Sequence, residues 1–205
     1  MPFEESPKTD KRERILVAAK TVFAEKGFAN ATIAGIAARA DIGKGTVYEY
    51  YKSKEELFFA VFEWFIAQDA ATAKIDISVL GLSVSERMIA LSENVIGQWA
   101  ELKDEFTLIM EFWAASTSGQ SRDRFREAFR KLYGHYRGII VALLQEGMDR
   151  GEYRQNLVPE SIAAAMVGAW DAMFLQAWFD DDFDIYPVSR DFMQVMLRGL
   201  QAEKN

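Results

Sequence analysis

Residues 32–54 read TIAGIAARADIGKGTVYEYYKSK, and this stretch predicts two short helices separated by a tight turn. Thr32 is expected to cap the first helix, which runs to residue 38 or 39. Gly43 and Gly45 bracket the start of the second helix, which runs to about Tyr50. The segment therefore predicts a compact helical hairpin in the N-terminal part of the chain.

The two helices have the features of a helix-turn-helix, in which the first helix crosses the DNA phosphates and the second enters the major groove. Helices that cross closely need a small residue at the crossing, and Ala37 supplies one. The turn needs a residue that tolerates a positive φ, and Asp41 is acceptable there although glycine would be better. The apolar anchors around the crossing are Ile33, Ile36, Ile42 and Val47.

Several side chains of this segment are of kinds that contact nucleic acid. Ammonium groups and tyrosine hydroxyls bind phosphate oxygens, whereas short polar side chains on a recognition helix reach base edges. The helix start at Thr32, with its unpaired N–H groups, is also suited to an anion. Phosphate contacts are therefore expected from Lys44, Tyr48, Tyr50, Lys52 and Lys54, and contacts near the bases from Thr46 and Glu49.

The segment IAARADIGKGTVYEYYKSKEEL, preceded by Phe23, Gly27 and Thr32, resembles the TetR family of bacterial regulators over roughly residues 10–60. The resemblance rests on IAxxA, GKGTVY, an aromatic pair and KSKEEL at fixed spacing. It implies phosphate contacts from Thr32, Lys44, Tyr48, Tyr50 and Lys54, and it places Gly45, Thr46 and Glu49 nearest the bases. The chain departs from the family pattern at Asp41, where glycine is usual, and at Tyr50, where histidine is frequent.

The charge of the chain is divided unevenly along its length. Residues 8–54 hold ten Lys and Arg against five Asp and Glu, whereas residues 55–205 hold fourteen against twenty-four. The formal net charge of the whole chain is −7. A basic N-terminal quarter on an acidic remainder is expected where only one end of a protein meets a polyanion such as DNA.

A fold made of helices is predicted for the whole chain, because apolar residues recur at helical spacing and no convincing strand is found. Capping boxes at Asp10–Glu13, Ser53–Glu56 and Ser83–Glu86 mark three helix starts. We expect an all-α protein with an N-terminal three-helix helix-turn-helix DNA-binding domain over residues 1–54. Residues 55–205 are expected to form a helical ligand-binding and dimerisation domain.

Composition argues against several other classes of protein. The chain has no cysteine and a single histidine, so thiolate metal sites are excluded and a zinc site is not expected. It has no phosphate-binding glycine loop and no nucleophile elbow, so we expect no enzyme, no catalytic residue, no metal and no cofactor. No apolar run reaches the ~18 residues that cross a bilayer, and the polar N-terminus does not resemble a signal peptide. We therefore expect a cytoplasmic protein with no membrane partner.

Aromatic residues beyond residue 54 are candidates for lining a small-molecule cavity. All five tryptophans lie there, and a cavity between helices with aromatic walls is the usual form of such a site. Aromatic residues at helical spacing also fill ordinary cores, and this alternative stays open for each of them. Asp171 lies in an apolar run, where its carboxylate needs an arginine, solvent or a ligand amine. The candidate set is Trp64, Trp99, Trp113, Tyr133, Tyr136, Trp170, Asp171 and Phe174.

Apolar stripes on the last two predicted helices are candidates for pairing two copies of the chain. Small and bulky residues are mixed around residues 163–177, which permits close helix approach, and residues 192–200 follow the spacing of a single buried stripe. A monomer would bury the same stripes internally, whereas the TetR resemblance implies a four-helix bundle between two chains. The predicted dimer residues are Met166, Trp170, Phe192, Val195, Met196 and Gly199.

The resemblance implies a transcriptional regulator, and a repressor is the simplest form of it. Such a protein binds near-palindromic double-stranded operator DNA as a homodimer and is released by a small, largely apolar effector. Two alternatives stay open, namely an activator or nucleoid-type DNA binder, and a helical adaptor protein. In the last case Tyr48, Tyr50 and Tyr51 would be ordinary core or surface aromatics.

Overall fold

The computed structural model describes residues 7–72, 81–98 and 103–202, and it divides the chain into two compact units. The first unit comprises the residues up to Thr72 together with Asp104–Phe129, and the second comprises the rest. Within the described ranges the regular structure is helical, apart from one isolated bridge between Tyr153 and Gln201. The predicted all-α fold class is thus confirmed. Residues 54 and 55 belong to the same packing unit, and the predicted division of functions between them stays a prediction.

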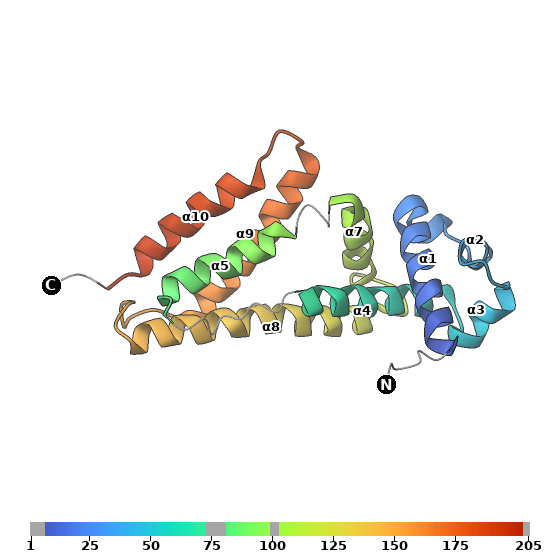
Figure 1. Ribbon diagram of the computed structural model, residues 1–205, viewed down its shortest axis with the longest axis horizontal. Coiled ribbons are helices and arrows are strands. Elements are labelled where there is room, and N and C mark those ends of the chain that lie inside the picture. The colour runs from blue at the N-terminus through green and yellow to red at the C-terminus, as the bar shows by residue number, and fades with distance from the viewer. Residues whose placement is uncertain (1–6, 73–80, 99–102, 203–205) are drawn as a thin grey trace. The chain divides into compact units, whose positions relative to one another are not determined.

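The first unit builds its helices around α1. It contains α1 (Pro7–Asn30), α2 (Ile33–Arg39), α3 (Lys44–Tyr50), α4 (Lys54–Thr72), α7 (Phe106–Ala115) and the N-terminal part of α8 (Arg122–Asp149). The 3-10 turn η1 (Lys103–Glu105) precedes α7 in the chain. In Figure 1, α2 and α3 lie next to each other on one flank of α1, and α7 lies on the opposite flank. The predicted helix-turn-helix is therefore α2 and α3, supported by α1.

Side-chain caps define the starts of α2 and α4. Thr32 Oγ1 accepts a hydrogen bond from the Gly35 N–H at 3.1 Å, as the sequence predicts. Ser53 Oγ accepts one from the Glu56 N–H at 3.1 Å. In a capping box the Glu56 carboxylate would accept a hydrogen bond from the Ser53 N–H. Here it accepts one from the N–H of the preceding residue, Lys52, at 2.8 Å.

Helix α1 begins earlier than the sequence predicts and is interrupted near its end. The capping box predicted at Asp10 is wrong, because the helix already begins at Pro7, whose fixed φ suits a first turn. Gly27 has φ 69° and ψ 162°, a backbone region open almost only to glycine. The chain therefore kinks at Gly27 before the last turn, which ends at Asn30.

Phenylalanine rings join the helix-turn-helix to α7 and α8 within the first unit. The Phe58 ring of α4 has its centroid 4.9 Å from that of Phe23, 5.0 Å from that of Phe112 and 5.7 Å from that of Phe125. All four side chains are buried. Such aromatic pairs contribute about 0.5–1.5 kcal/mol each beyond the area they bury, so the cluster fixes α1 and α4 against α7 and α8.

The second unit contains α5 (Val84–Gly97), most of α8, α9 (Pro159–Phe179) and α10 (Ile185–Leu200). Helix α5 begins at the complete capping box of Ser83 and Glu86 that the sequence predicts. Figure 1 shows α5 and α10 running antiparallel, side by side. The buried hydroxyls of Ser92 and Ser189 hydrogen-bond between them at 3.2 Å, and Trp170 Nε1–H donates to Ser92 Oγ at 3.1 Å. This polar contact ties α5, α9 and α10 together.

Helix α9 has unusual composition among the helices of the described residues. It is the one helix there that is long and apolar enough to cross a membrane by those two criteria alone. Its buried residues include Met166, Val167 and Trp170, and the helix packs against α5 and α10. Core helices of water-soluble proteins pass the same test, so the composition of α9 is weak evidence for a membrane span.

Candidate functional site

The turn between α2 and α3 has the geometry that the sequence predicts. Asp41 has a φ of 54°, and among the described residues it is the one position other than glycine with a positive φ. The Ile42 N–H donates to the Ala37 carbonyl at 3.0 Å, which closes the turn. Arg14 of α1 donates to the Ala40 carbonyl at 2.6 Å, so the last carbonyls of α2 are held from outside the hairpin. The turn is therefore anchored to α1.

Helix α3 turns one side into the core of the first unit and the other outward. Val47 is fully buried, and Tyr51, directly after the helix, is also buried. Tyr51 is thus a core aromatic, which is one of the roles that the sequence left open for this residue. By contrast Tyr48 exposes 46% of its surface, and Lys44 Nζ lies 5.8 Å from the Tyr48 ring centroid. The helix therefore presents a cation and a phenol together on its open side.

The other predicted DNA contacts on α2 and α3 are at the surface or partly so. Thr32, Gly45 and Glu49 are exposed, whereas Thr46 and Tyr50 are half-buried. A Cβ built on Gly45 would meet no heavy atom within 4 Å, so the backbone there is open to close approach. The predicted contacts on α3 thus lie at or near one surface, but their roles toward DNA stay predictions.

Lys54 is held by the protein itself. Its ammonium group donates to the carbonyls of Phe28, Ala29 and Ala31 at 2.7, 3.2 and 3.0 Å, and it lies 4.5 Å from the Phe28 ring centroid. Three donors therefore meet three carbonyls that follow the kink at Gly27. The sequence gives Lys54 a phosphate contact, which stays a prediction. The structure adds a second role, because this side chain ties the start of α4 to the end of α1.

The basic side chains near α3 differ in whether they already bind another group of the protein. Arg39 pairs with Glu25 at 2.9 Å. Arg12 donates to the Tyr51 hydroxyl at 3.4 Å, and this hydrogen bond raises the pKa of its guanidinium. Lys44 and Lys52 are exposed and have no ion pair within the part of the chain that the structure describes. These two ammonium groups are the ones most available to phosphates.

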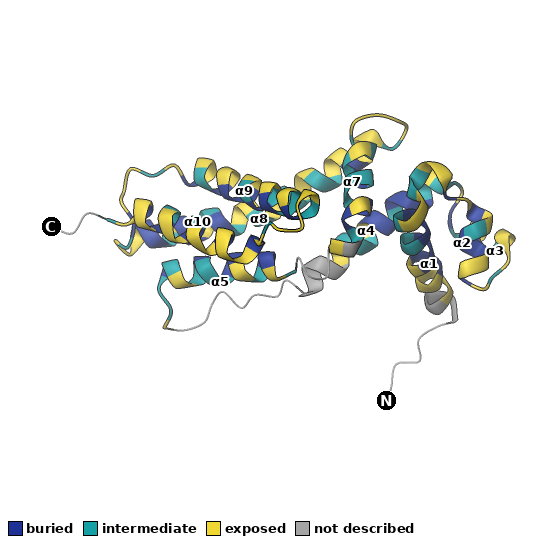
Figure 2. Cartoon of the chain, turned by 90° about the horizontal axis from the view of Figure 1, so that it is seen from above, coloured by how far each residue is buried: buried dark blue, intermediate teal, exposed yellow. Residues whose placement is uncertain are grey.

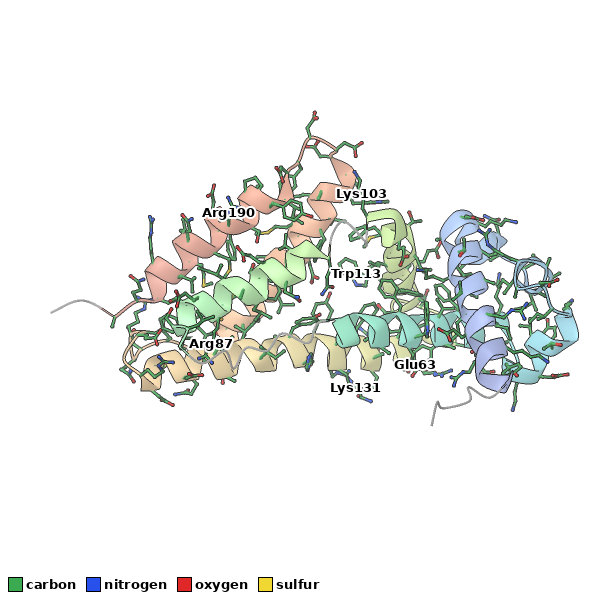
Figure 3. The ribbon with its side chains drawn as sticks, viewed as in Figure 1. Glu63, Arg87, Lys103, Trp113, Lys131 and Arg190 are labelled. Atoms are coloured by element: carbon green, nitrogen blue, oxygen red, sulfur yellow. The ribbon has the colours of Figure 1, made fainter. Side chains whose placement is uncertain are left out.

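The residues predicted to line an effector cavity are divided between the two units. Trp64 of α4 and Trp113 of α7 belong to the first unit, and Figure 3 labels Trp113. Trp99 lies outside the described residues. The remaining five belong to α8 and α9 in the second unit, namely Tyr133, Tyr136, Trp170, Asp171 and Phe174. The second unit thus holds most of the predicted set.

In the second unit these residues form a partly polar group. The Tyr136 and Trp170 rings meet edge to face with centroids 6.5 Å apart. Asp171 is half-buried, and burial raises the pKa of its carboxyl to about 6, which a hydrogen bond from Tyr133 partly offsets. The structure thus shows Asp171 partly exposed to solvent and hydrogen-bonded to a tyrosine hydroxyl.

Sequence reasoning missed two amides, one on α5 and one directly after its last residue. Asn94 Oδ1 and Gln98 Nε2 are buried and have no hydrogen-bond partner among the described residues. They are four residues apart, so they lie on one face of the helix, and Arg87, seven residues before Asn94, uses the same face to pair with Glu146 of α8. Unpaired buried amides cost free energy, which a ligand or water can recover. The signal in the sequence was a pair of amides at helical spacing, next to the apolar residues of the same helix.

The predicted dimer residues differ in exposure. Met166 and Trp170 are 1% and 3% exposed, so the protomer itself buries them. Val195 is 71% exposed, Gly199 is exposed, and Phe192 and Met196 are half-buried. Figure 2 shows exposed bands along both α9 and α10. The structure thus leaves an apolar stripe of α10 uncovered, while the pairing of two chains stays a prediction.

Comparison with known proteins matches residues 15–61 to the family model of bacterial regulatory proteins, tetR family. The HTH-type transcriptional repressor NicS of Pseudomonas putida is 30% identical over 150 residues, which cover 71% of this chain and 67% of that protein. A fatty acid metabolism regulator protein of Bacillus subtilis is 23% identical over 94% of this chain and 97% of its own length. A transcriptional regulator from Saccharomonospora viridis, solved in complex with choline, has a TM-score of 0.78 at 18% identity and covers 94% of this chain and 98% of that one.

Proposed function

The chain belongs to the TetR family of bacterial transcriptional regulators, and we propose that it is a cytoplasmic repressor that binds operator DNA as a dimer until a small effector releases it. The observation that supports this proposal most directly is that α3 presents one side outward. An outward helix with Lys44 and Tyr48 on its open side sits on a turn held by α1. This is the arrangement that places a recognition helix in the major groove.

We assign the residues of α3 to two kinds of contact with DNA. Lys44 and Tyr48 are proposed to bind phosphates, together with Thr32 at the start of α2 and the half-buried Tyr50. Gly45, Thr46 and Glu49 are proposed to lie nearest the bases, because Gly45 and Glu49 are exposed on α3 and Thr46 is partly so. The phosphate contacts supply affinity, whereas the second group supplies preference for a sequence.

The dimer is proposed to form through α9 and α10. Val188, Phe192, Val195 and Gly199 recur at helical spacing on a side of α10 that adjoins its buried face. On α9, the exposed residues Ala165, Gly168 and Ala172 are small, and Phe179 at the end of the helix is 71% exposed. Small residues permit a partner helix to approach closely, and the exposed apolar side chains gain from burial.

The effector is proposed to bind in the second unit and to be largely apolar with at least one polar group. The aromatic pair of Tyr136 and Trp170 supports an apolar contact surface. The unpartnered amides of Asn94 and Gln98, and the half-buried Asp171, support a polar group on the ligand. An effector releases DNA only to the extent that it binds the released state more tightly than the DNA-bound state.

An electrophoretic shift experiment tests this function. The full chain is titrated onto its own upstream DNA and onto unrelated duplex at about 50 and 200 mM salt. We expect a discrete complex with a near-palindromic segment, which persists at the higher salt and in the presence of competitor. Salt-sensitive binding to any duplex would instead favour a nucleoid-type protein, and absence of binding would favour an adaptor. The variant Thr46→Ala should change preference among operator variants more than overall affinity.

A further inference from the structure

A pocket lies within the first unit. Its volume is about 260 Å³, and it is formed by the end of α1, the start of α4, α7, the turn after α7 and the start of α8. This size suits a small ligand rather than a drug-sized one. The side chains that decide its chemistry are Phe28, Glu55, Phe58, Glu111 and Phe125.

The pocket combines carboxylates with aromatic walls. Phe58 and Phe125 are buried members of the phenylalanine cluster, with ring centroids 5.7 Å apart, and Phe28 lies 4.8 Å from Phe58. Glu55 and Glu111 have no cationic partner within the described part of the chain. The Lys54 ammonium already lies 4.5 Å from the Phe28 ring centroid. The attraction of the pocket for a further cation therefore comes from the two carboxylates and the other two rings, since carboxylates and aromatic faces both attract cations.

The backbone at Gly27 makes room for one of these carboxylates. A Cβ built on Gly27 would lie 2.8 Å from Glu111 Oε1, so a side chain at this position would displace the Glu111 carboxylate from where it lies. Glu111 is half-buried, and its carboxylate lies beside the kink of α1 at Gly27. A half-buried carboxylate without a counter-charge costs free energy, and a cation in the pocket would recover part of it.

We propose that this pocket binds a small organic cation that has an apolar body. The ammonium group would pair with Glu111, with Glu55 adding to the negative field, and the apolar body would lie on the phenylalanine rings. An inorganic cation fits less well, because two carboxylates beside an aromatic wall provide few of the oxygen ligands that such ions require. The site is distinct from the proposed effector site, since all its lining residues belong to the first unit.

A ligand in this pocket would contact both sides of the first unit. It would touch the start of α4, which Lys54 ties to α1, and also the turn between α7 and α8.

The probe for the test is phenethylammonium, with 2-phenylethanol as its neutral analogue of similar shape. Binding to the full chain is measured by isothermal titration calorimetry. Glu111→Gln removes the charge and keeps the shape, Asp171→Asn removes the carboxylate of the proposed effector site, and Glu160→Gln is an exposed control on α9. We expect binding of the cation in preference to the alcohol, about fivefold weaker binding to Glu111→Gln, and unchanged binding to the other two variants.

Two results would overturn the proposal. One is equal binding of cation and alcohol, or no binding of either. The other is loss of binding in Asp171→Asn with retention in Glu111→Gln, which would place the cation in the second unit. If Glu111→Gln is unfolded by circular dichroism, the exposed Glu55→Gln variant replaces it, and unchanged affinity of that variant for the cation would equally contradict the site.

Discussion

Two residues of this chain adopt states that are unfavourable for their residue type, one in its backbone conformation and one in the burial of its carboxyl group. Asp41 adopts a positive φ because the turn between α2 and α3 requires it, and Asp171 keeps a carboxyl half-buried beside a tyrosine. In the first case the cost lies in the backbone, and in the second it lies in the desolvation of a charge. Each cost can be measured, because a single substitution at each position removes it.

Replacing Asp41 by alanine should lower the free energy of unfolding of the first unit by about 1 kcal/mol. Alanine lacks the polar side chain that eases the left-handed conformation. Asp41→Gly should lie within about 0.5 kcal/mol of the wild type, because relief at a positive φ is offset by a more flexible unfolded chain. Urea unfolding followed by circular dichroism measures both. A glycine variant less stable than the alanine variant would contradict this account of the turn.

Asp171→Asn should change how stability depends on pH. The folded pKa of Asp171 is raised to about 6, so the folded state holds this proton more tightly than the unfolded state. Its contribution to stability is thus present at low pH and is lost as pH rises toward and through 6. The variant should lack this loss and gain up to ~3 kcal/mol relative to wild type at about pH 8, but little at about pH 4. Unfolding curves whose difference is independent of pH would contradict the assignment.

At the scale of elements, the helix-turn-helix combines a buried anchor with an open recognition surface. Val47 and the adjacent Tyr51 fix α3 to the core, while Lys44 and Tyr48 remain available. Lys54 works at the opposite end of the motif, where it closes the joint between α1 and α4. Lys44 is therefore available to a ligand outside the protein, whereas Lys54 stabilises the contact between two helices.

The variants Lys44→Ala and Lys54→Ala should separate these tasks. Lys44→Ala should weaken binding to all duplexes, reduce the salt slope by about one and leave the melting temperature unchanged. Lys54→Ala should lower the free energy of unfolding by about 1–3 kcal/mol, because three carbonyls lose their donor. Lys26→Ala, an exposed lysine on α1, is the control and should change neither quantity. A Lys54→Ala protein of full stability would show that the observed hydrogen bonds contribute little.

Local patterns made most of the helix-turn-helix predictable from the sequence. The cap at Thr32, the turn at Asp41 and the helix ending at Tyr50 follow from residues close to one another in the chain. The contacts of Lys54 with α1 could not be predicted, since they depend on the kink at Gly27 and on tertiary packing. The polar side chains of the effector region were only partly foreseen, because periodicity indicates a buried face but not which buried amides lack partners.

At the scale of the whole molecule, DNA recognition is proposed to require two copies of the chain. One recognition helix spans a single half-site, and its few phosphate contacts give modest affinity. Pairing through α9 and α10 would join two such helices on one scaffold and add their contacts. The exposed stripe of α10, with Val195 at its centre, is the surface on which this depends.

Val195→Asp should convert the dimer to a monomer. The side chain is 71% exposed in the protomer, so the substitution costs little in the fold but places a charge in the proposed interface. Analytical ultracentrifugation should show the smaller species, and operator affinity should fall by at least about tenfold. Gln194→Asp, an exposed neighbour off the stripe, is the matched control and should remain dimeric. A dimeric Val195→Asp protein would contradict the proposed seam.

The most direct test of the central claim is a hydroxyl-radical footprint of the wild-type protein on its own upstream DNA. Two outward copies of α3 on one dimer should protect two segments on the same face of the duplex, centred about one helical turn or a whole multiple of it apart. Lys44→Ala should weaken both segments together. A single protected segment, or uniform protection without a repeat, would contradict the claim that α3 meets DNA twice per assembly.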